Sequence, residues 1–321
     1  MAEKISPQEG KVRETEEKMR YFLKNHNSIC VGVSGGSDSE IILHMIADTS
    51  LREFLPKIHF VFQNTGIEYR ATLRHLDYME TRYGIHIDRI RGESVVSVVR
   101  REGLPILSKN FSHTVSQASR GAPSAWEKIK GEKKFHDGKQ SRFNFTPAQR
   151  RLAEYILENG IPVSDKCCDL SKKKPFHEYL KQIHADLSIS GERQAEGGAR
   201  ATRHNCCFEQ GDIDKYMPLW FWDDKTKQYY KERECIVFSD CYEVWGMKRT
   251  GCVGCPFNSR VGKDLELIKI YEPGLYKVCM KVFGESYKLM DDFEVHRQKV
   301  METQLTMDIW EKEQKKKEEP V

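Results

Sequence analysis

Residues 28–46 join a short apolar segment, a loop of glycine and serine, and a second apolar segment with helical spacing. The first segment, 28–33, has the length of a buried strand, and the second, 40–46, repeats its apolar side chains as a helix does. The loop between them is Ser34-Gly35-Gly36-Ser37-Asp38-Ser39. A strand that enters a helix through such a loop brings backbone N–H groups and the positive end of the helix dipole to one point. The sequence therefore predicts a phosphate-binding site in an α/β fold.

The loop carries further groups that suit a phosphate ligand. Ser34, Ser37 and Ser39 would add hydroxyl donors. Asp38 could orient a Mg²⁺ ion bound to the phosphates. The loop lacks the lysine of the Walker A sequence GxxxxGK[ST], so a phosphate loop of another class is indicated. The alternative is a turn that only joins a strand to a helix.

Other segments continue an alternation of strand and helix. The apolar pattern predicts strands over 28–33, 58–62, 85–90 and 186–190 and helices over 8–26 and 68–83. Strands that alternate with helices form a parallel, doubly wound sheet, which binds its ligands at the carboxyl ends of the strands. Ser34 and Asn64 both follow such ends, so we expect them to face one crevice.

Length and composition narrow the class of protein. A chain of 321 residues with 39% hydrophobic residues can form the core of one large or two modest domains. No apolar run approaches the roughly 18 residues of a membrane span, and Met1-Ala2-Glu3-Lys4 does not open a signal peptide. We therefore expect a cytoplasmic protein without a membrane partner. In that compartment, ten cysteines indicate metal binding or redox chemistry rather than disulfides.

A basic stretch, 108–152, differs from its surroundings. It holds ten lysines and arginines against three acidic residues, a net charge of +7, and five aromatic residues are spread among them. Basic and aromatic side chains together can bind RNA or DNA through phosphates and stacked bases. The alternative is a solvated insertion whose aromatic rings pack back on the core.

Two pairs of cysteines have the spacing of a metal site. Cys167 and Cys168 are adjacent, and Cys252 and Cys255 form a CxxC sequence 84 residues further on. Four thiolates complete the ligand shell of zinc or of an iron–sulfur cluster. Adjacent cysteines suit one tetrahedral zinc ion poorly, because neighbouring side chains diverge, and a cluster with several iron atoms accepts them more easily, which favours a 4Fe–4S cluster. A third pair, Cys206-Cys207, could replace Cys167-Cys168 as ligands, carry a persulfide, or only pack.

Several of these motifs, taken in order, resemble known families. The loop resembles the SGGxDS loop of the PP-loop ATP pyrophosphatases. The cysteine pattern with its neighbours resembles that of adenylyl-sulfate reductases and of proteins grouped with phosphoadenosine phosphosulfate (PAPS) reductases, over roughly residues 25–260. The segments that carry this second resemblance are 63–68 (like DTG), 167–175 (like CC-x-x-x-K-x-x-P), 190–193 (like TGxR) and 249–257 (like RTGCxxCPF).

The resemblance implies an adenine nucleotide alpha hydrolase-like fold with a cysteine-rich, mostly helical C-terminal region. It implies that ATP or an adenylyl nucleotide is bound by Ser34, Gly35, Gly36, Ser37, Asp38, Ser39, Asn64, Thr65, Gly66, Gly191 and Arg193. Asp38 and Arg193 would be catalytic. Cys167, Cys168, Cys252 and Cys255 would hold the 4Fe–4S cluster.

We expect four parts along the chain. Residues 1–107 would begin the PP-loop nucleotide-binding domain, and 108–152 would be the basic insertion. Residues 153–260 would complete that domain and carry the cysteine ligands. Residues 261–321 would form a C-terminal helical segment and a charged tail, which begins near Lys312 and is either a frayed helix end or a disordered segment.

Two departures from the sulfonucleotide reductases bear on function. Their phosphate loop is usually degenerate, whereas SGGSDS is intact here, and their C-terminal reactive cysteine has no counterpart after Cys279. This combination looks more like tRNA thiolation enzymes and the DNA phosphorothioation sulfurtransferase. We therefore expect an ATP pyrophosphatase-type sulfurtransferase that adenylates an acceptor, with a sulfur donor protein or thiol reductant as partner. The alternatives are a sulfonucleotide (APS or PAPS) reductase and a non-catalytic iron–sulfur nucleotide sensor or nucleic-acid-binding accessory protein.

Overall fold

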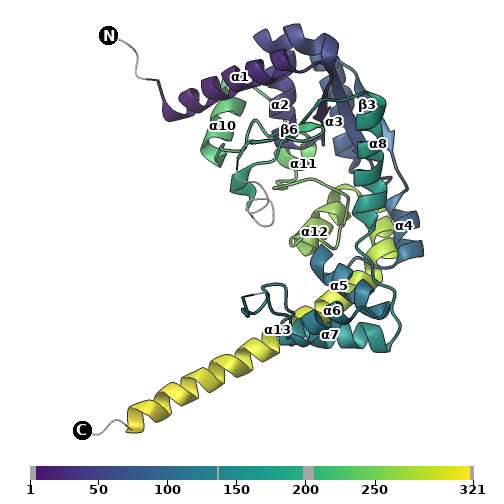
Figure 1. Ribbon diagram of the computed structural model, residues 1–321, viewed down its shortest axis with the longest axis vertical. Coiled ribbons are helices and arrows are strands. Elements are labelled where there is room, and N and C mark those ends of the chain that lie inside the picture. Colours follow the sequence, from purple (N-terminus) through teal and green to yellow (C-terminus); the bar gives the residue numbers. More distant parts are fainter. Residues whose placement is uncertain (1–4, 136, 198–205, 319–321) are drawn as a thin grey trace. The chain divides into compact units, whose positions relative to one another are not determined.

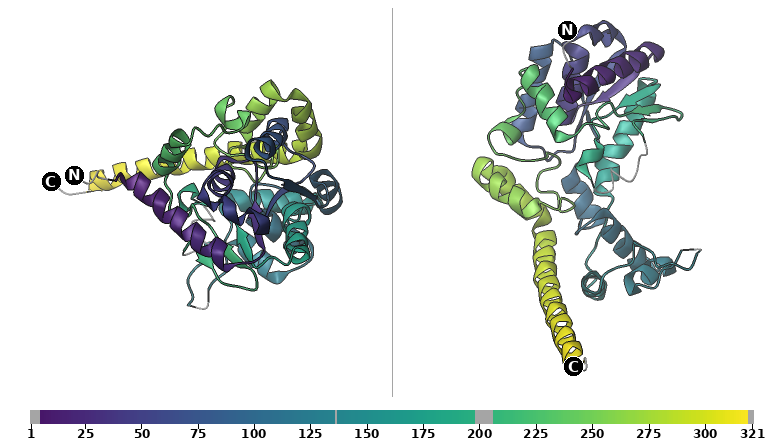
Figure 2. Two further views of the ribbon diagram at one scale, coloured as in Figure 1. Left: turned by 90° about the horizontal axis from the view of Figure 1, so that it is seen from above. Right: turned by 90° about the vertical axis from the view of Figure 1, so that its left-hand side faces the viewer.

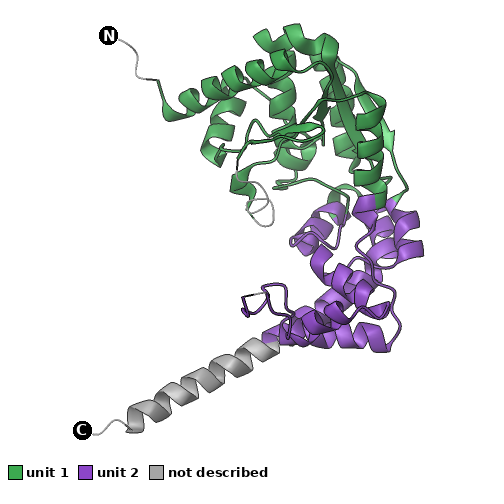
Figure 3. Ribbon diagram, viewed as in Figure 1, with its two compact units in different colours: residues 1–94, 170–253, 270–272 green, residues 95–169, 254–269, 273–321 purple. Residues whose placement is uncertain are grey.

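The computed structural model describes residues 5–135, 137–197 and 206–318, with side chains up to residue 298. The chain forms two compact units (Figure 3). Residues 1–94, 170–253 and 270–272 make the sheet unit, and residues 95–169, 254–269 and 273–321 make the helical unit. Each unit therefore combines segments that are distant in the sequence.

The sheet unit is built on one six-stranded sheet, whose order is β3-β2-β1-β4-β6-β5. Its strands are β1 (Ile29–Gly32), β2 (Ile58–Asn64), β3 (Ile87–Arg91), β4 (Leu187–Ile189), β5 (Phe208–Glu209) and β6 (Asp214–Tyr216). Every neighbouring pair is parallel except the edge pair of β5 and β6. The predicted α/β class with a mostly parallel sheet is therefore confirmed, and the four expected strands are β1 to β4.

Helices cover both faces of this sheet, as a doubly wound fold requires (Figures 1 and 2). Alternate residues of β1 point to opposite faces: Ile29 and Val31 belong to the large core, and Cys30 belongs to a smaller cluster. The large core is formed with α1 (Pro7–Asn25), α2 (Ser37–Ala47), α3 (Arg70–Tyr83) and α10 (Asp224–Arg233). The smaller cluster is formed with α8 (Lys174–Gln182). The expected helices over 8–26 and 68–83 are α1 and α3.

The helical unit packs several helices around its own apolar core. They are α4 (Val95–Glu102), α5 (Lys109–Ser119), α6 (Pro123–Lys130), α7 (Pro147–Glu158), most of α12 (Val261–Tyr271) and α13 (Pro273–Glu318). Phe111, Ile129 and Ile156 are buried in this core. The expected basic insertion, 108–152, thus contains α5, α6 and the first half of α7, and the charged tail continues α13 as far as Glu318.

Short helical elements complete the chain: η1 (Ser50–Lys57), η2 (Asp169–Lys173), η3 (Gln194–Glu196) and α11 (Asp240–Glu243). Among the described residues, no helix has both the length and the apolar character needed to cross a membrane.

A half-buried carboxylate fastens α1 to α10. Glu9 accepts hydrogen bonds from Arg13 Nε (2.7 Å), Tyr229 Oη (2.9 Å) and Arg233 Nη1 (2.7 Å). These donors, Arg13 first, lower the pKa of Glu9 from 4.5 to about 2. Because the folded pKa is depressed, this stabilisation is complete above pH 4.5 and is lost as the pH falls through 2.

We expect Glu9→Gln to lower the free energy of unfolding by about 1 kcal/mol at pH 7, a value reduced for solvent screening. The difference from wild type should vanish below pH 2, because Glu9 is then protonated and carries no charge in the wild-type protein. Urea unfolding at several pH values measures this. Glu17→Gln, at an exposed position on the same helix, is the control. Equal pH profiles for all three proteins would contradict the prediction.

Candidate functional site

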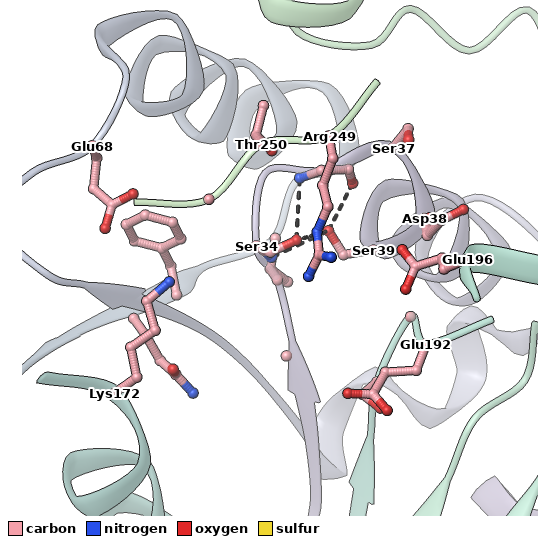
Figure 4. A pocket seen from close by; sticks show the side chains of 18 of the residues that line it. Ser34, Ser37, Asp38, Ser39, Glu68, Lys172, Glu192, Glu196, Arg249 and Thr250 are labelled. Atoms are coloured by element: carbon pink, nitrogen blue, oxygen red, sulfur yellow. Dashed lines mark hydrogen bonds between the residues drawn. The ribbon is translucent and has the colours of Figure 1, made fainter. Parts of the chain in front are cut away.

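The loop between β1 and α2 has the backbone of an anion site (Figure 4). Gly35 has φ +67°, and a β-carbon there would lie 2.5 Å from Thr72 Cγ2, so only glycine fits. Gly36 is the N-cap of α2 and makes no side-chain capping bond. The N-cap residue therefore gives the first N–H groups of α2 no side-chain acceptor, and the Ser37 backbone bonds the Tyr242 phenol instead. The positive end of the helix can still attract an anion.

Two serines hold the loop in this shape. Ser39 Oγ accepts a hydrogen bond from Ser34 N (3.1 Å) and donates one to Gly36 O (2.8 Å). Ser34 Oγ accepts from Gly36 N (3.2 Å) and lies 3.1 Å from Ser39 Oγ. Figure 4 shows these bonds inside the loop. The hydroxyls expected to be donors to phosphate thus stabilise the loop itself.

A pocket of about 280 Å³ opens over the loop, within the sheet unit. Its wall is made by most of residues 32–39, by 61–63 at the end of β2, by 190–192 after β4, and by 248–251. This places it at the carboxyl ends of three parallel strands, where doubly wound sheets bind ligands.

The pocket contains part of the expected nucleotide site. Of the expected residues, its described wall includes Ser34, Gly36, Ser37, Asp38, Ser39 and Gly191, and leaves out Gly35, Asn64, Thr65, Gly66 and Arg193. After β2, Gln63 and Glu68 line the pocket instead. Asn64 faces its own turn, where its Oδ1 accepts from Gly66 N (2.8 Å). Ser34 and Asn64 thus do not line one crevice as expected, because the chain turns away after Gln63.

Gly191 is required for the close approach of two segments. A β-carbon there would lie 3.0 Å from Ser39 N and 3.1 Å from the carbonyl carbon of Asp38. The turn after β4 therefore rests directly on the first turn of α2.

Asp38 lies between two cations rather than at a vacant metal position. Its Oδ1 is 2.9 Å from Arg193 Nε and 2.9 Å from Lys227 Nζ, and Lys227 also donates to Ser37 Oγ (2.5 Å). Arg193 is buried and also pairs with Asp224 Oδ1 (3.0 Å). The charges of Asp38 and Arg193 are therefore paired within the sheet unit. Their expected roles toward Mg²⁺ and phosphate stay predictions.

The cations that do line the pocket are Arg249, Lys248 and Lys172. Figure 4 shows the side chain of Arg249 directed at Ser34 and Ser39. The sequence analysis assigned no role to Arg249 or Lys172. Both lie in segments that resemble family motifs: Arg249 opens the RTGCxxCPF-like segment, and Lys172 is the lysine of the CC-x-x-x-K-like segment.

A tyrosine holds the segment that carries Arg249. Tyr242 Oη accepts a hydrogen bond from Thr250 N (3.1 Å) and lies 3.0 Å from Thr250 Oγ1. A β-carbon on Gly36 would lie 3.1 Å from the same Oη, so the phenol touches the start of α2. Burial raises the pKa of Tyr242, which keeps the phenol neutral. The backbone that carries Arg249 is thereby held next to the loop between β1 and α2.

At the other side of the pocket, a chain of contacts links Glu68 to a cysteine. The Glu68 carboxylate accepts hydrogen bonds from Thr65 N (3.0 Å) and Thr65 Oγ1 (2.6 Å). Cys252 Sγ in turn donates to Thr65 Oγ1 (3.6 Å). Burial raises the pKa of Glu68, although Lys172 and the Thr65 bonds oppose the shift. The CxxC sequence therefore begins beside the turn after β2.

The four expected metal ligands divide between the units: Cys252 belongs to the sheet unit, and Cys167, Cys168 and Cys255 belong to the helical unit. Gly254, with φ +63°, makes the turn inside the CxxC sequence, and a β-carbon there would lie 2.7 Å from Cys279 Sγ. Among the described residues, no group of three or more histidines, cysteines or carboxylates is placed to hold a metal ion. The cluster stays a prediction.

The remaining cysteines are distributed through the fold. Cys206 is exposed and donates to Phe208 O (2.7 Å), whereas Cys207 is half-buried and packs against the large core. Burial raises the pKa of Cys207, and raises those of Cys30, Cys241 and Cys279 to about 12. These four thiols stay protonated at neutral pH.

One family model matches most of the chain, and several known proteins are similar to it. The phosphoadenosine phosphosulfate reductase domain matches residues 28–118 and 127–258. An uncharacterised protein of Methanocaldococcus jannaschii is 26% identical over 264 residues, which cover 78% of this chain and 42% of that protein. The chain thus spans less than half the length of that relative. The phosphoadenosine 5'-phosphosulfate reductase of Escherichia coli is 23% identical over 246 residues, 72% of this chain and 91% of the enzyme.

Two solved structures resemble this chain with TM-scores below 0.5. Phosphoadenylyl-sulfate reductase from Candida auris, in a phosphate complex, gives a TM-score of 0.45 at 16% identity and covers 74% of this chain and 87% of its own. The U34-tRNA thiolase NcsA from Methanococcus maripaludis, with its [4Fe-4S] cluster, gives 0.40 at 14% identity and covers 89% and 79%.

Proposed function

The chain belongs to the phosphoadenosine phosphosulfate reductase domain family, and from this premise we propose that it adenylates an acceptor with ATP and so prepares it for sulfur transfer. The observation that carries the proposal is the start of α2, which lines a pocket with Arg249 beside it and has no side-chain cap. Backbone N–H groups and a guanidinium at one point suit a polyphosphate.

The pocket residues support this assignment by their chemistry. The N–H groups of α2 and Arg249 would bind the phosphates, with Lys172 and Lys248 adding positive charge. Val33, Val61 and Phe62 give the pocket an apolar side that suits an adenine ring. Tyr242 would keep Arg249 in position during the reaction.

The proposed reaction has two displacements. An oxygen of the acceptor attacks the α-phosphorus of ATP, the bond to the β-phosphate oxygen breaks, and pyrophosphate leaves with the electron pair. A sulfur nucleophile from a donor then attacks the activated atom, and AMP leaves with the oxygen. Fixed N–H groups and cations lower the barrier of the first step by offsetting the charge of the leaving pyrophosphate.

We propose Cys167, Cys168, Cys252 and Cys255 as ligands of a 4Fe–4S cluster. Four thiols are the donor set that such clusters require. Gly254 forms a turn between Cys252 and Cys255 that leaves no room for a β-carbon. When bound, the cluster would supply a site that holds sulfur. We propose no magnesium ligand, because Asp38 is paired with Arg193 and Lys227.

A second candidate is a sulfonucleotide reductase. The name of the matched domain and the Escherichia coli relative favour it. Pyrophosphate released from ATP supports the sulfurtransferase, whereas sulfite released from a sulfonucleotide in the presence of a thiol reductant supports the reductase. Nucleotide binding with neither product would indicate the non-catalytic sensor.

The test of the site uses Arg249→Ala. We expect kcat/KM for pyrophosphate release to fall about 100-fold, because one charged donor to phosphate is lost. Thermal stability should not change, since Arg249 is exposed. Arg120→Ala, at an exposed arginine outside the pocket, is the matched control. Wild-type rates in Arg249→Ala would contradict the assigned phosphate site.

A further inference from the structure

A short hairpin in the helical unit carries exposed basic and aromatic side chains. In this basic hairpin (residues 133–143), Lys134 pairs with Gln140 as an antiparallel bridge. Phe135 N donates to Lys139 O (2.8 Å) in the same turn. These bonds join the described residues on either side of position 136.

The aromatic residues of this region fall into two groups. Phe111 and Phe145 are buried and stack at 5.0 Å between ring centroids, so they serve the core. Phe135 and Phe143 are 49% and 42% exposed. Asn144 ties the base of the hairpin down, because its Nδ2 donates to two backbone carbonyls at 3.0 Å. Two partly exposed rings on an anchored hairpin leave an aromatic surface open to a ligand.

Exposed cations belong to the same hairpin as the two rings. Arg142 lies over Phe143, with Cζ 4.9 Å from the ring centroid. Lys134 and Arg142 are exposed and form no ion pair with the part of the chain that the structure describes. Lys133 is different, because it pairs with Glu127 at 3.0 Å. Fewer positive charges are therefore available to a ligand than the composition of the basic stretch 108–152 indicates.

We propose that the basic hairpin binds single-stranded nucleic acid. Phe135 and Phe143 stack on bases, and Lys134 and Arg142 contact the phosphates. A duplex keeps its base faces covered, so it offers nothing to the two rings. An acidic peptide would match the charge but has no flat faces for them. The surface lies in the helical unit, so the inference does not depend on the proposed nucleotide chemistry of the sheet unit.

Fluorescence anisotropy with 12-nucleotide single strands of RNA and DNA, without ATP, tests the proposal. We expect Phe135→Ala combined with Phe143→Ala to weaken binding about 10- to 100-fold with no change in salt dependence. Lys134→Gln combined with Arg142→Gln should reduce the slope of log K against log salt by about 1.4. Tyr155→Ala, at a 51% exposed aromatic on α7, is the matched control and should bind as wild type.

Several outcomes would overturn the proposal. They are the absence of single-strand binding at about 50 mM salt, equal binding of a duplex, and phenylalanine variants that bind as wild type. Displacement of the strand by an acidic peptide at equal concentration would point to a protein partner instead. Thermal unfolding of each variant verifies that it is folded. Because ATP is absent, failure here leaves the test of Arg249 intact, and the reverse also holds.

Discussion

Asp38→Asn is expected to lower the free energy of unfolding by about 3 kcal/mol or more. The substitution keeps the shape of the side chain but removes the charge that lies 2.9 Å from both Arg193 and Lys227. Arg193 is buried and Lys227 is 17% exposed, so water replaces the lost carboxylate only in part. Removing one partner from a buried ion pair costs more than the pair contributes, because a charge is left uncompensated.

Urea unfolding of two variants separates this effect from a general loss of charge. Asp224 pairs with the same guanidinium but is 88% exposed, so Asp224→Asn should change stability by less than about 1 kcal/mol. A double variant, Asp38→Asn with Lys227→Met, should be less destabilised than the sum of the single changes. If Asp38→Asn unfolds like Asp224→Asn yet no longer binds Mg-ATP, Asp38 acts on the ligand, and the result supports the magnesium expectation.

Anaerobically prepared protein is expected to be brown and to hold about four iron atoms per chain. The argument rests on Cys167, Cys168, Cys252 and Cys255, which supply a complete thiolate shell. Cys252→Ser should bleach the protein and lower its iron content. It should also lower its thermal stability, because a cluster held by cysteines 84 residues apart cross-links the chain. Absorbance, iron analysis and thermal unfolding measure these effects independently of activity.

Cys235→Ser is the matched control for the iron experiment. Cys235 is exposed, and its thiol donates only to a backbone carbonyl of its own turn, so its loss should leave the colour and iron unchanged. Zinc in place of iron would remove the redox part of the proposal and retain the structural part. Iron that survives in Cys167→Ser but is lost in Cys206→Ser or Cys207→Ser would show that the other cysteine pair provides the ligands.

The sequence predicted those helices and strands that are determined by the pattern of their own residues. The strand, glycine-serine loop and helix over residues 28–46 are β1, the pocket loop and the start of α2, because their periodicity and their glycines are visible without any partner. It missed β5 and β6, which have two and three residues. Strands that short have no period of their own, and their pairing with β4 and with each other defines them.

The proposed nucleotide site also contains residues that the sequence could identify and residues that depend on tertiary contacts. Gly35, Gly36 and Gly191 could be assigned from the sequence, because a phosphate loop and a close packing turn both require a residue without a β-carbon. The sequence could not show which arginine is available to a ligand. Arg193 and Arg249 have the same side chain, but folding buries the first between Asp38 and Asp224 and leaves the second exposed beside the loop. Only the tertiary structure decides this, because the charge that neutralises an arginine comes from residues far away in the chain.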